Sequence, residues 1–152
     1  MNQRAKYSPA VLVLRSIPGV GVRTAEAVAA FIDDPDRFRD AKAIGRYFGL
    51  VPSQDQSGPR NRLGHITRQG PPVVRQLVAE ATWQALRRSP TVRAYFERVR
   101  RDDPLRTKIA LVATAHYLVR VMLALLKRGT TWEEGFALAD EPKGVARAVT
   151  MI

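Results

Sequence analysis

Apolar residues recur at every third or fourth position through most of this chain, which is the spacing of amphipathic helices. Residues that begin or end helices mark their boundaries, such as Ser8 before Pro9 and Gly129 after Lys127. The sequence has no sustained alternation of apolar and polar positions of the kind that strands show. The pattern predicts an all-α fold with helices over residues 9–16, 24–32, 41–48, 71–86, 91–101 and 105–127, and a small one over 132–139.

One long stretch, residues 49–70, has neither helical nor strand periodicity and is rich in glycine, proline and arginine. Stretches of this length inside compact domains are usually functional or disordered. Residues 53–66 are the one place where a short strand hairpin is expected. We predict a single helical domain over residues 1–139, in which this loop precedes a bundle of longer helices over 71–139, followed by a tail over 140–152.

The composition adds a strong positive charge to this picture. The chain has 152 residues, of which 45% are hydrophobic, enough for one ordinary domain with a core. Lysine and arginine number 25 against 14 acids, which gives a net charge of +11. A surface of this charge favours polyanions, and nucleic acid is the first of them. The plainer alternative is a basic protein that binds nucleic acid only non-specifically at low salt.

The absence of cysteine excludes disulfides, thiolate metal sites and cysteine nucleophiles. With only two histidines as well, no metal site is predicted within this chain. The longest apolar segment, residues 109–126, is interrupted by His116 and Arg120 and predicts a buried helix, not a membrane span. No secretion signal is recognisable at the amino terminus. We therefore expect a cytoplasmic protein without a membrane partner.

Residues 9–32 resemble a helix-hairpin-helix motif. Two glycines on either side of Val20 allow a sharp turn, and Val20 is expected to enter the core. The free amides at the start of the following helix then face outward, where they can bind phosphate. The alternative is a tight corner between helices with a purely structural role. The nucleic-acid-binding residues predicted here are Gly19, Val20, Gly21, Arg23 and Thr24.

The second candidate site is Ser57, which lies in the glycine-rich loop. A serine hydroxyl becomes a nucleophile when a neighbouring group takes its proton and another stabilises charge on the phosphorane. Arginines suit the second role because their planar fork matches phosphate oxygens. Asp55 and His65 are near in sequence, but neither is identified as the base. From the residues alone, Ser57-Gly58 is more often a turn. The basic residues around it are Arg60, Arg62, His65, Arg68 and Arg75.

Residues 12–88 resemble the carboxy-terminal transposase domain of the bacterial insertion-sequence IS110 family. The elements of the family pattern occur in order and with natural spacing. They are Ile17-Pro18-Gly19-Val20-Gly21, Thr24-Ala25, Asp36-Arg37-Phe38, Tyr47-Phe48-Gly49-Leu50-Val51-Pro52, Gln56-Ser57-Gly58, Gly64-His65-Ile66-Thr67-Arg68-Gln69-Gly70 and Val74-Arg75.

The resemblance implies a DNA recombinase whose serine attacks a phosphodiester and forms a covalent phosphoserine link, assisted by an RNA-guided assembly. The serine of the family falls on Ser57, and Arg75 falls on the arginine that opens the next helix. Arg60, Arg62, Arg68 and Arg75 join the nucleic-acid-binding set. Two departures are Arg68, where the family commonly has lysine, and Gly70-Pro71, where it has Gly-Asn. The loop-shaping motif positions are Gly58, Gly64, Thr67 and Gly70.

The family pattern also includes an amino-terminal RuvC-like domain whose four acidic residues bind magnesium, and this chain shows no such arrangement. We expect an isolated domain, an expressed fragment or a truncated gene product, which binds DNA without recombining it. No cofactor is expected in this chain, and magnesium is expected only with the missing domain. The expected partners are DNA, a guide RNA, the RuvC-like domain and further copies of the chain on DNA. The alternative is a non-catalytic helix-hairpin-helix module, a transposase remnant or a structural oligomerisation domain.

A final feature is the excess of cations between Arg87 and Lys108. Eight lysines or arginines face three acids in this segment, which could follow a phosphate backbone. A solvated helical face explains the same composition. The eight are Arg87, Arg88, Arg93, Arg98, Arg100, Arg101, Arg106 and Lys108.

Overall fold

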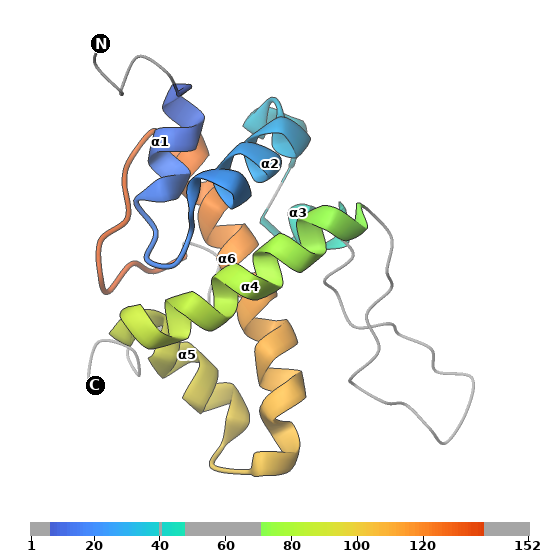
Figure 1. Ribbon diagram of the computed structural model, residues 1–152, viewed down its shortest axis with the longest axis vertical. Coiled ribbons are helices and arrows are strands. Elements are labelled where there is room, and N and C mark those ends of the chain that lie inside the picture. The colour runs from blue at the N-terminus through green and yellow to red at the C-terminus, as the bar shows by residue number, and fades with distance from the viewer. Residues whose placement is uncertain (1–6, 40, 48–70, 139–152) are drawn as a thin grey trace.

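The computed structural model describes residues 7–39, 41–47 and 71–138, and the regular secondary structure in these ranges is all helical, with no strand in them (Figure 1). The predicted all-α fold is therefore confirmed. The predicted strand hairpin at 53–66, the loop at 49–70 and the tail at 140–152 lie outside the described residues. The helices are α1 Pro9–Arg15, α2 Val22–Ile32, α3 Ala41–Tyr47, α4 Pro72–Arg88, α5 Pro90–Arg100 and α6 Thr107–Arg128, with short 3-10 helices η2 Pro35–Arg37 and η3 Pro104–Arg106.

Local sequence signals set the helix ends close to where the pattern predicted them. The Ser8 hydroxyl accepts a hydrogen bond from the Val11 amide at 3.3 Å and begins α1, whose first residue is Pro9. The Ser89 hydroxyl does the same for α5, accepting from the Val92 amide at 3.2 Å. Gly129 ends α6 in the left-handed conformation, at φ 67°. These ends follow from short-range chemistry, which explains why they could be predicted.

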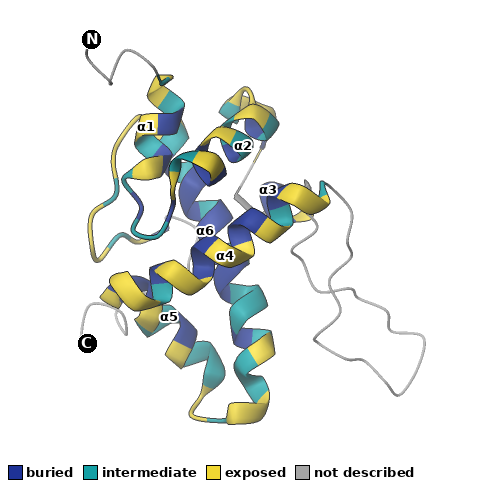
Figure 2. Cartoon of the chain, viewed as in Figure 1, coloured by how far each residue is buried: buried dark blue, intermediate teal, exposed yellow. Residues whose placement is uncertain are grey.

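Helix α6 is the centre of the fold, and α1, α3, α4 and α5 all pack against it (Figure 1). Figure 2 shows that its second half is buried while the outer faces of α4 and α5 are exposed. One hydrophobic cluster draws on all six helices. The largest wholly buried side chains in it include Leu14, Ile17, Ile32, Ile44, Leu118, Met122, Leu123 and Leu125.

The predicted buried role of residues 109–126 is confirmed. The helical stretch Pro104–Arg128 is the one segment among the described residues that is long and apolar enough to cross a membrane, and 56% of its most apolar window is buried within the protein. A core helix has this composition because it must present apolar residues to neighbours on several sides. Ten residues of α6, from Ala110 to Leu125, are buried.

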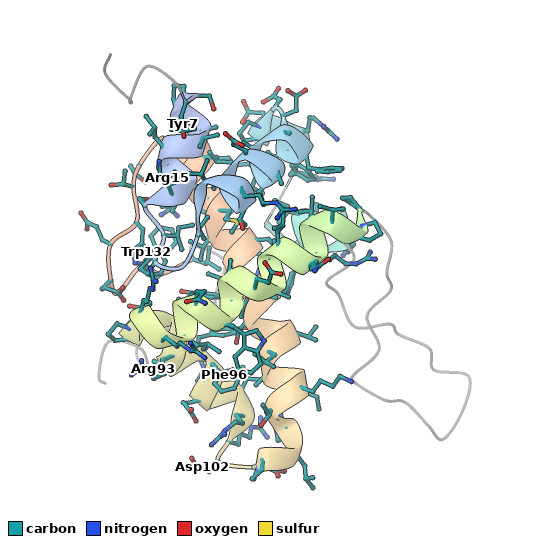
Figure 3. All side chains as sticks on the ribbon, viewed as in Figure 1. Tyr7, Arg15, Arg93, Phe96, Asp102 and Trp132 are labelled. Atoms are coloured by element: carbon teal, nitrogen blue, oxygen red, sulfur yellow. The ribbon has the colours of Figure 1, made fainter. Side chains whose placement is uncertain are left out.

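The small helix predicted at residues 132–139 is wrong over its described part. Residues 130–138, which we call the strap, run without helix from the end of α6 back along the protein, with one turn at Glu134-Gly135. Gly135 has φ 84°, outside the helical region. Long-range hydrogen bonds hold the strap, and a helix of eight residues would have to nucleate at their expense. The Trp132 amide donates to the Ser16 hydroxyl at 2.9 Å, which places Trp132 beside the end of α1 (Figure 3).

Glu134 fastens the strap to the amino terminus of α5. Its Oε2 accepts from the Ser89 hydroxyl at 2.9 Å, the Thr91 amide at 3.1 Å and the Thr91 hydroxyl at 2.5 Å. Its Oε1 accepts from the indole nitrogen of Trp132 at 3.1 Å. Partial burial by itself raises the pKa of Glu134, but the hydrogen bonds from Thr91, Trp132 and Ser89 outweigh it, so the pKa lies below its ordinary value. The carboxylate thus caps α5 from 43 residues away.

Helices α3 and α6 approach closely where Gly45 meets His116. A β-carbon on Gly45 would overlap the imidazole ring of His116. We expect Gly45→Ala to destabilise the protein by about 1–2 kcal/mol, because the overpacking cost exceeds the gain in helix propensity. Thermal unfolding measures this change. In a His116→Ala background the same Gly45→Ala substitution should be neutral or stabilising, and an equal cost in both backgrounds would contradict the contact.

Candidate nucleic-acid interface

The turn between α1 and α2, residues 16–21, is built around Gly19. Gly19 has φ 90°, and a β-carbon there would lie 2.5 Å from the Ala85 nitrogen and 2.9 Å from the Ala81 oxygen. The turn therefore rests directly on the backbone of α4, and only glycine allows this approach. Val20 is 6% exposed, as predicted for the apolar residue between the two glycines. Gly19 and Val20 thus position the turn, and Gly19 faces α4 instead of solvent.

The amino terminus of α2 opens to solvent next to this turn. Gly21 is the N-cap residue, no side chain caps the helix, and a β-carbon on Gly21 would meet nothing within 4 Å. Arg23 is exposed, whereas Thr24 is buried. The first amides of a helix and an arginine beside them favour an anion. Of the five residues predicted to bind nucleic acid in the helix-hairpin-helix motif, Gly21 and Arg23 are therefore the two that are accessible to a partner.

Helix α4 joins this turn to the glycine-rich loop. It begins at Pro72, directly after that loop, and it carries the α1–α2 turn at Ala81–Ala85. Arg75 is half-buried in its first turn, and its amide bonds to the Pro71 carbonyl at 3.2 Å. Rigid packing against α2, α5 and α6 fixes the helix. The two predicted binding elements are thus attached to one helix.

In the basic segment from Arg87 to Lys108 some cations bind backbone carbonyls and some are exposed to solvent, and Arg93 does both. Arg93 donates to the carbonyls of Leu86 at 3.0 Å and Arg87 at 3.2 Å, closing the carboxyl end of α4 (Figure 3). Arg106 does the same for α5 through the Val99 carbonyl at 3.1 Å. Arg100 lies 3.4 Å from Glu97. The exposed cations are Arg87, Arg88, Arg93, Arg101 and Lys108.

Several predicted site residues lie outside the described residues. Among the described residues there is no group of three or more histidines, cysteines or acids that could hold a metal ion. The predicted nucleophile and the loop-shaping glycines belong to the undescribed part, as do the arginines near them. These are Ser57, Gly58, Arg60, Arg62, Gly64, Thr67, Arg68 and Gly70.

Comparison with known proteins gives the chain its family. The model of the transposase IS116/IS110/IS902 family matches residues 11–97, which span the α1–α2 turn, the glycine-rich loop and α4. The chain belongs to the IS116/IS110/IS902 transposase family. It is 30% identical to the uncharacterized 43.6 kDa protein of insertion element IS110 from Streptomyces coelicolor, over 88% of this chain and 33% of that protein. It is 31% identical to the transposase for insertion sequence element IS1111A from Coxiella burnetii, over 80% of this chain and 34% of that protein.

The chain therefore spans about a third of the length of these two relatives. Within it, several residues that carry the family resemblance have structural roles. Gly19 allows the contact with α4, and Phe38 is buried. Arg37 donates to the Ile32 carbonyl at 3.4 Å and so caps α2. The family motifs in this chain thus include residues that stabilise the fold as well as candidate residues of the site.

Sequence reasoning missed the strap as part of the site's support. Ser16 is the first residue of the α1–α2 turn; its hydroxyl oxygen accepts from the Trp132 amide, and the hydroxyl donates to the Val13 carbonyl at 2.5 Å. Glu134 then ties the same strap to the junction of α4 and α5. The only local signal was the tripeptide Trp132-Glu133-Glu134, which is equally typical of the start of a helix. No short-range pattern identifies the partners.

Proposed function

We propose that this chain is the serine-bearing domain of a DNA transposase, with Ser57 as the nucleophile that attacks a phosphodiester. The observation that carries the proposal is the family match over residues 11–97, which includes Ser57 and its flanking arginines. Attack by the Ser57 oxygen forms a bond to phosphorus and releases a DNA hydroxyl as leaving group. Arg60, Arg62, Arg68 and Arg75 are proposed to stabilise the phosphorane charge.

The geometry of the described helices supports DNA binding by the same chain. The exposed start of α2 and Arg23 favour a phosphate contact that does not read sequence. Because the α1–α2 turn rests on α4, the start of α2 has a fixed position relative to the helix that follows the loop of Ser57 in the chain. The net charge of +11 makes this binding strongly dependent on salt.

A complete active site requires groups from outside this chain. We propose that a RuvC-like domain supplies acidic residues and their magnesium, that a guide RNA directs the assembly, and that several copies act together on DNA in the cytoplasm. Within this chain, Arg75 and the loop arginines hold the phosphate, and Gly58, Gly64, Thr67 and Gly70 shape the loop. The chain alone is expected to bind DNA without cutting it.

A second function is favoured by the exposed start of α2 alone. A non-catalytic helix-hairpin-helix module would use Gly21 and Arg23 to hold nucleic acid and would need no reaction at Ser57. Both functions predict binding that weakens with salt, so binding cannot separate them. Covalent attachment to DNA separates them.

The test is trapping of covalent DNA attachment by this chain fused to the acidic amino-terminal domain of a family relative. With Ser57→Ala we expect attachment to fall at least about a thousandfold, because no other group replaces the nucleophile, while DNA affinity stays within about twofold. Gel mobility under denaturing conditions measures attachment.

Ser53→Ala is the matched control, since Ser53 lies in the same loop and should leave attachment unchanged. Attachment that persists in Ser57→Ala would contradict the proposed nucleophile. An active fusion that exchanges strands without ever attaching to DNA would favour the binding module for this chain.

A further inference from the structure

The outer face of α4 carries an exposed tryptophan that the proposed chemistry does not use. Trp83 is 49% exposed, although a tryptophan side chain gains much by burial. No hydrogen bond, aromatic ring or guanidinium group engages it within the described part of the chain. An indole left open on a rigid helix is suited to contact a partner with a flat apolar surface.

The surroundings of Trp83 are polar and basic. Its exposed neighbours on the helix are Gln76, Ala79, Glu80, Gln84 and Arg87, so it is not the centre of an apolar patch. The other exposed apolar residue of α4, Val73, lies ten residues away, or about 15 Å along the helix. A protein partner that buried Trp83 would normally find other apolar residues beside it in the core of the interface, and its exposed neighbours here are only polar residues and Ala79.

Charge favours a polyanion at this position. Arg87 lies one turn beyond Trp83, and Arg88 and Arg93 cluster at the same end of α4, where Arg93 bonds to the Leu86 and Arg87 carbonyls. On the face of Trp83 itself Glu80 and Arg87 are the charged neighbours, and Arg88 and Arg93 add positive charge at the end of the helix. Single-stranded nucleic acid is bound by this combination, with bases stacked on aromatic rings and the backbone beside cations.

The position also connects the two elements of the proposed DNA surface. The α1–α2 turn rests on α4 at Ala81–Ala85, where the Gln84 backbone also approaches it, and helical spacing places Arg88 on the same side of α4. At 100° per residue, Gln84, then Arg87 and then Trp83 lie progressively further around the helix from the contact with the turn. Trp83 lies 11 residues after Pro72, about 16 Å from the exit of the Ser57 loop. A nucleic-acid strand bound at the Ser57 loop can therefore extend along α4 to the indole ring.

We propose that Trp83 is a stacking platform for an unpaired nucleobase, with Arg87 and Arg88 holding the adjoining phosphates. The proposal rests on the proposed nucleic-acid-binding function and adds a preference for unpaired bases over duplex. Duplex DNA offers no free base face to this ring, whereas an opened DNA strand or a single-stranded RNA segment does.

The test compares two probes of equal length and charge, a single-stranded oligothymidylate and its abasic deoxyribose-phosphate analogue. We expect Trp83→Ala to weaken binding of the oligothymidylate about tenfold and binding of the abasic probe less than twofold. The chain has two tryptophans, so the difference in fluorescence between the unmodified protein and Trp83→Phe reports Trp83. That signal should be quenched by the oligothymidylate alone. Using oligouridylate in place of the oligothymidylate tests whether the platform also accepts RNA.

Leu105→Ala is the control variant, because Leu105 is 89% exposed and lies far along the chain on η3. It should leave the affinity for both probes unchanged. Equal binding of both probes by the unmodified protein and Trp83→Ala, without quenching, would overturn the stacking platform and leave the proposed DNA binding intact. Failure of the unmodified protein to bind either probe at low salt would overturn both proposals.

Discussion

Gly19→Ala is expected to destabilise this protein by about 3 kcal/mol or more. Two costs add at this position. Alanine at φ 90° is strained, which costs about 1–3 kcal/mol. Its β-carbon would also lie 2.5 Å from the Ala85 nitrogen, and the backbone of α4 cannot move aside as a side chain could. The α1–α2 turn must lift from α4 or α4 must shift.

Thermal unfolding measures this effect directly. For a chain of this size, a loss of about 3 kcal/mol lowers the midpoint by roughly 6–12 °C. We also expect weaker DNA binding, since the start of α2 loses its fixed position. Both changes arise from one displaced contact.

Gly21→Ala is the matched control from the same turn. Gly21 has φ −86°, and a β-carbon there meets nothing within 4 Å. Its unfolding free energy should change by less than about 1 kcal/mol, because a weaker N-cap is offset by lower entropy of the unfolded chain. Equal destabilisation by the two substitutions would show that the turn does not rest on α4 as described.

Glu134→Ala has the second largest expected effect, a loss of about 2 kcal/mol in unfolding free energy. The substitution removes the acceptor of four hydrogen bonds. The wholly buried Ser89 and the nearly buried Thr91 then lose the carboxylate to which they donate. The loss is limited because Glu134 is itself exposed and water can replace part of its hydrogen bonding. Glu134→Gln should cost about half as much, since one amide oxygen can satisfy only one side of the carboxylate.

The Glu134 contribution should depend on pH in a definite direction. Its pKa is lowered in the folded protein, so the stabilisation is fully present above the ordinary glutamate pKa of about 4.3. It is lost as the pH falls through the lower, folded-state pKa. Urea unfolding of the unmodified protein and Glu134→Gln should therefore converge as the pH is lowered below 4. A constant gap would contradict the carboxylate's role.

Glu133→Ala provides the control for both measurements. Glu133 is the neighbouring exposed acid of the strap, and its backbone carbonyl accepts from the Phe136 amide without help from its side chain. Its removal should change stability by less than about 0.5 kcal/mol at any pH. A cost as large as that of Glu134→Ala would point to the strap's general charge and not to the cap on α5.

The candidate site was partly predictable from the sequence. The glycine spacing predicted a turn with Val20 in the core, and the cation count predicted a polyanion partner. The backbone hydrogen bonds of Arg93 and Arg106 were not predictable, because they depend on which carbonyls end the preceding helices. The exposure of Trp83 was equally hidden, since a tryptophan in a helical pattern is usually assigned to the core.

The sequence by itself determined the helical class, the approximate ends of six helices and the burial of α6. Each depends on periodicity, caps and breakers within a few residues, so local chemistry is sufficient. Only the tertiary structure decided that Gly19 rests on α4, that residues 132–138 form a strap and not a helix, and that Glu134 caps α5. These outcomes depend on partners 40 or more residues apart, whose contacts no local pattern encodes and whose combined energy overrides a weak helical preference.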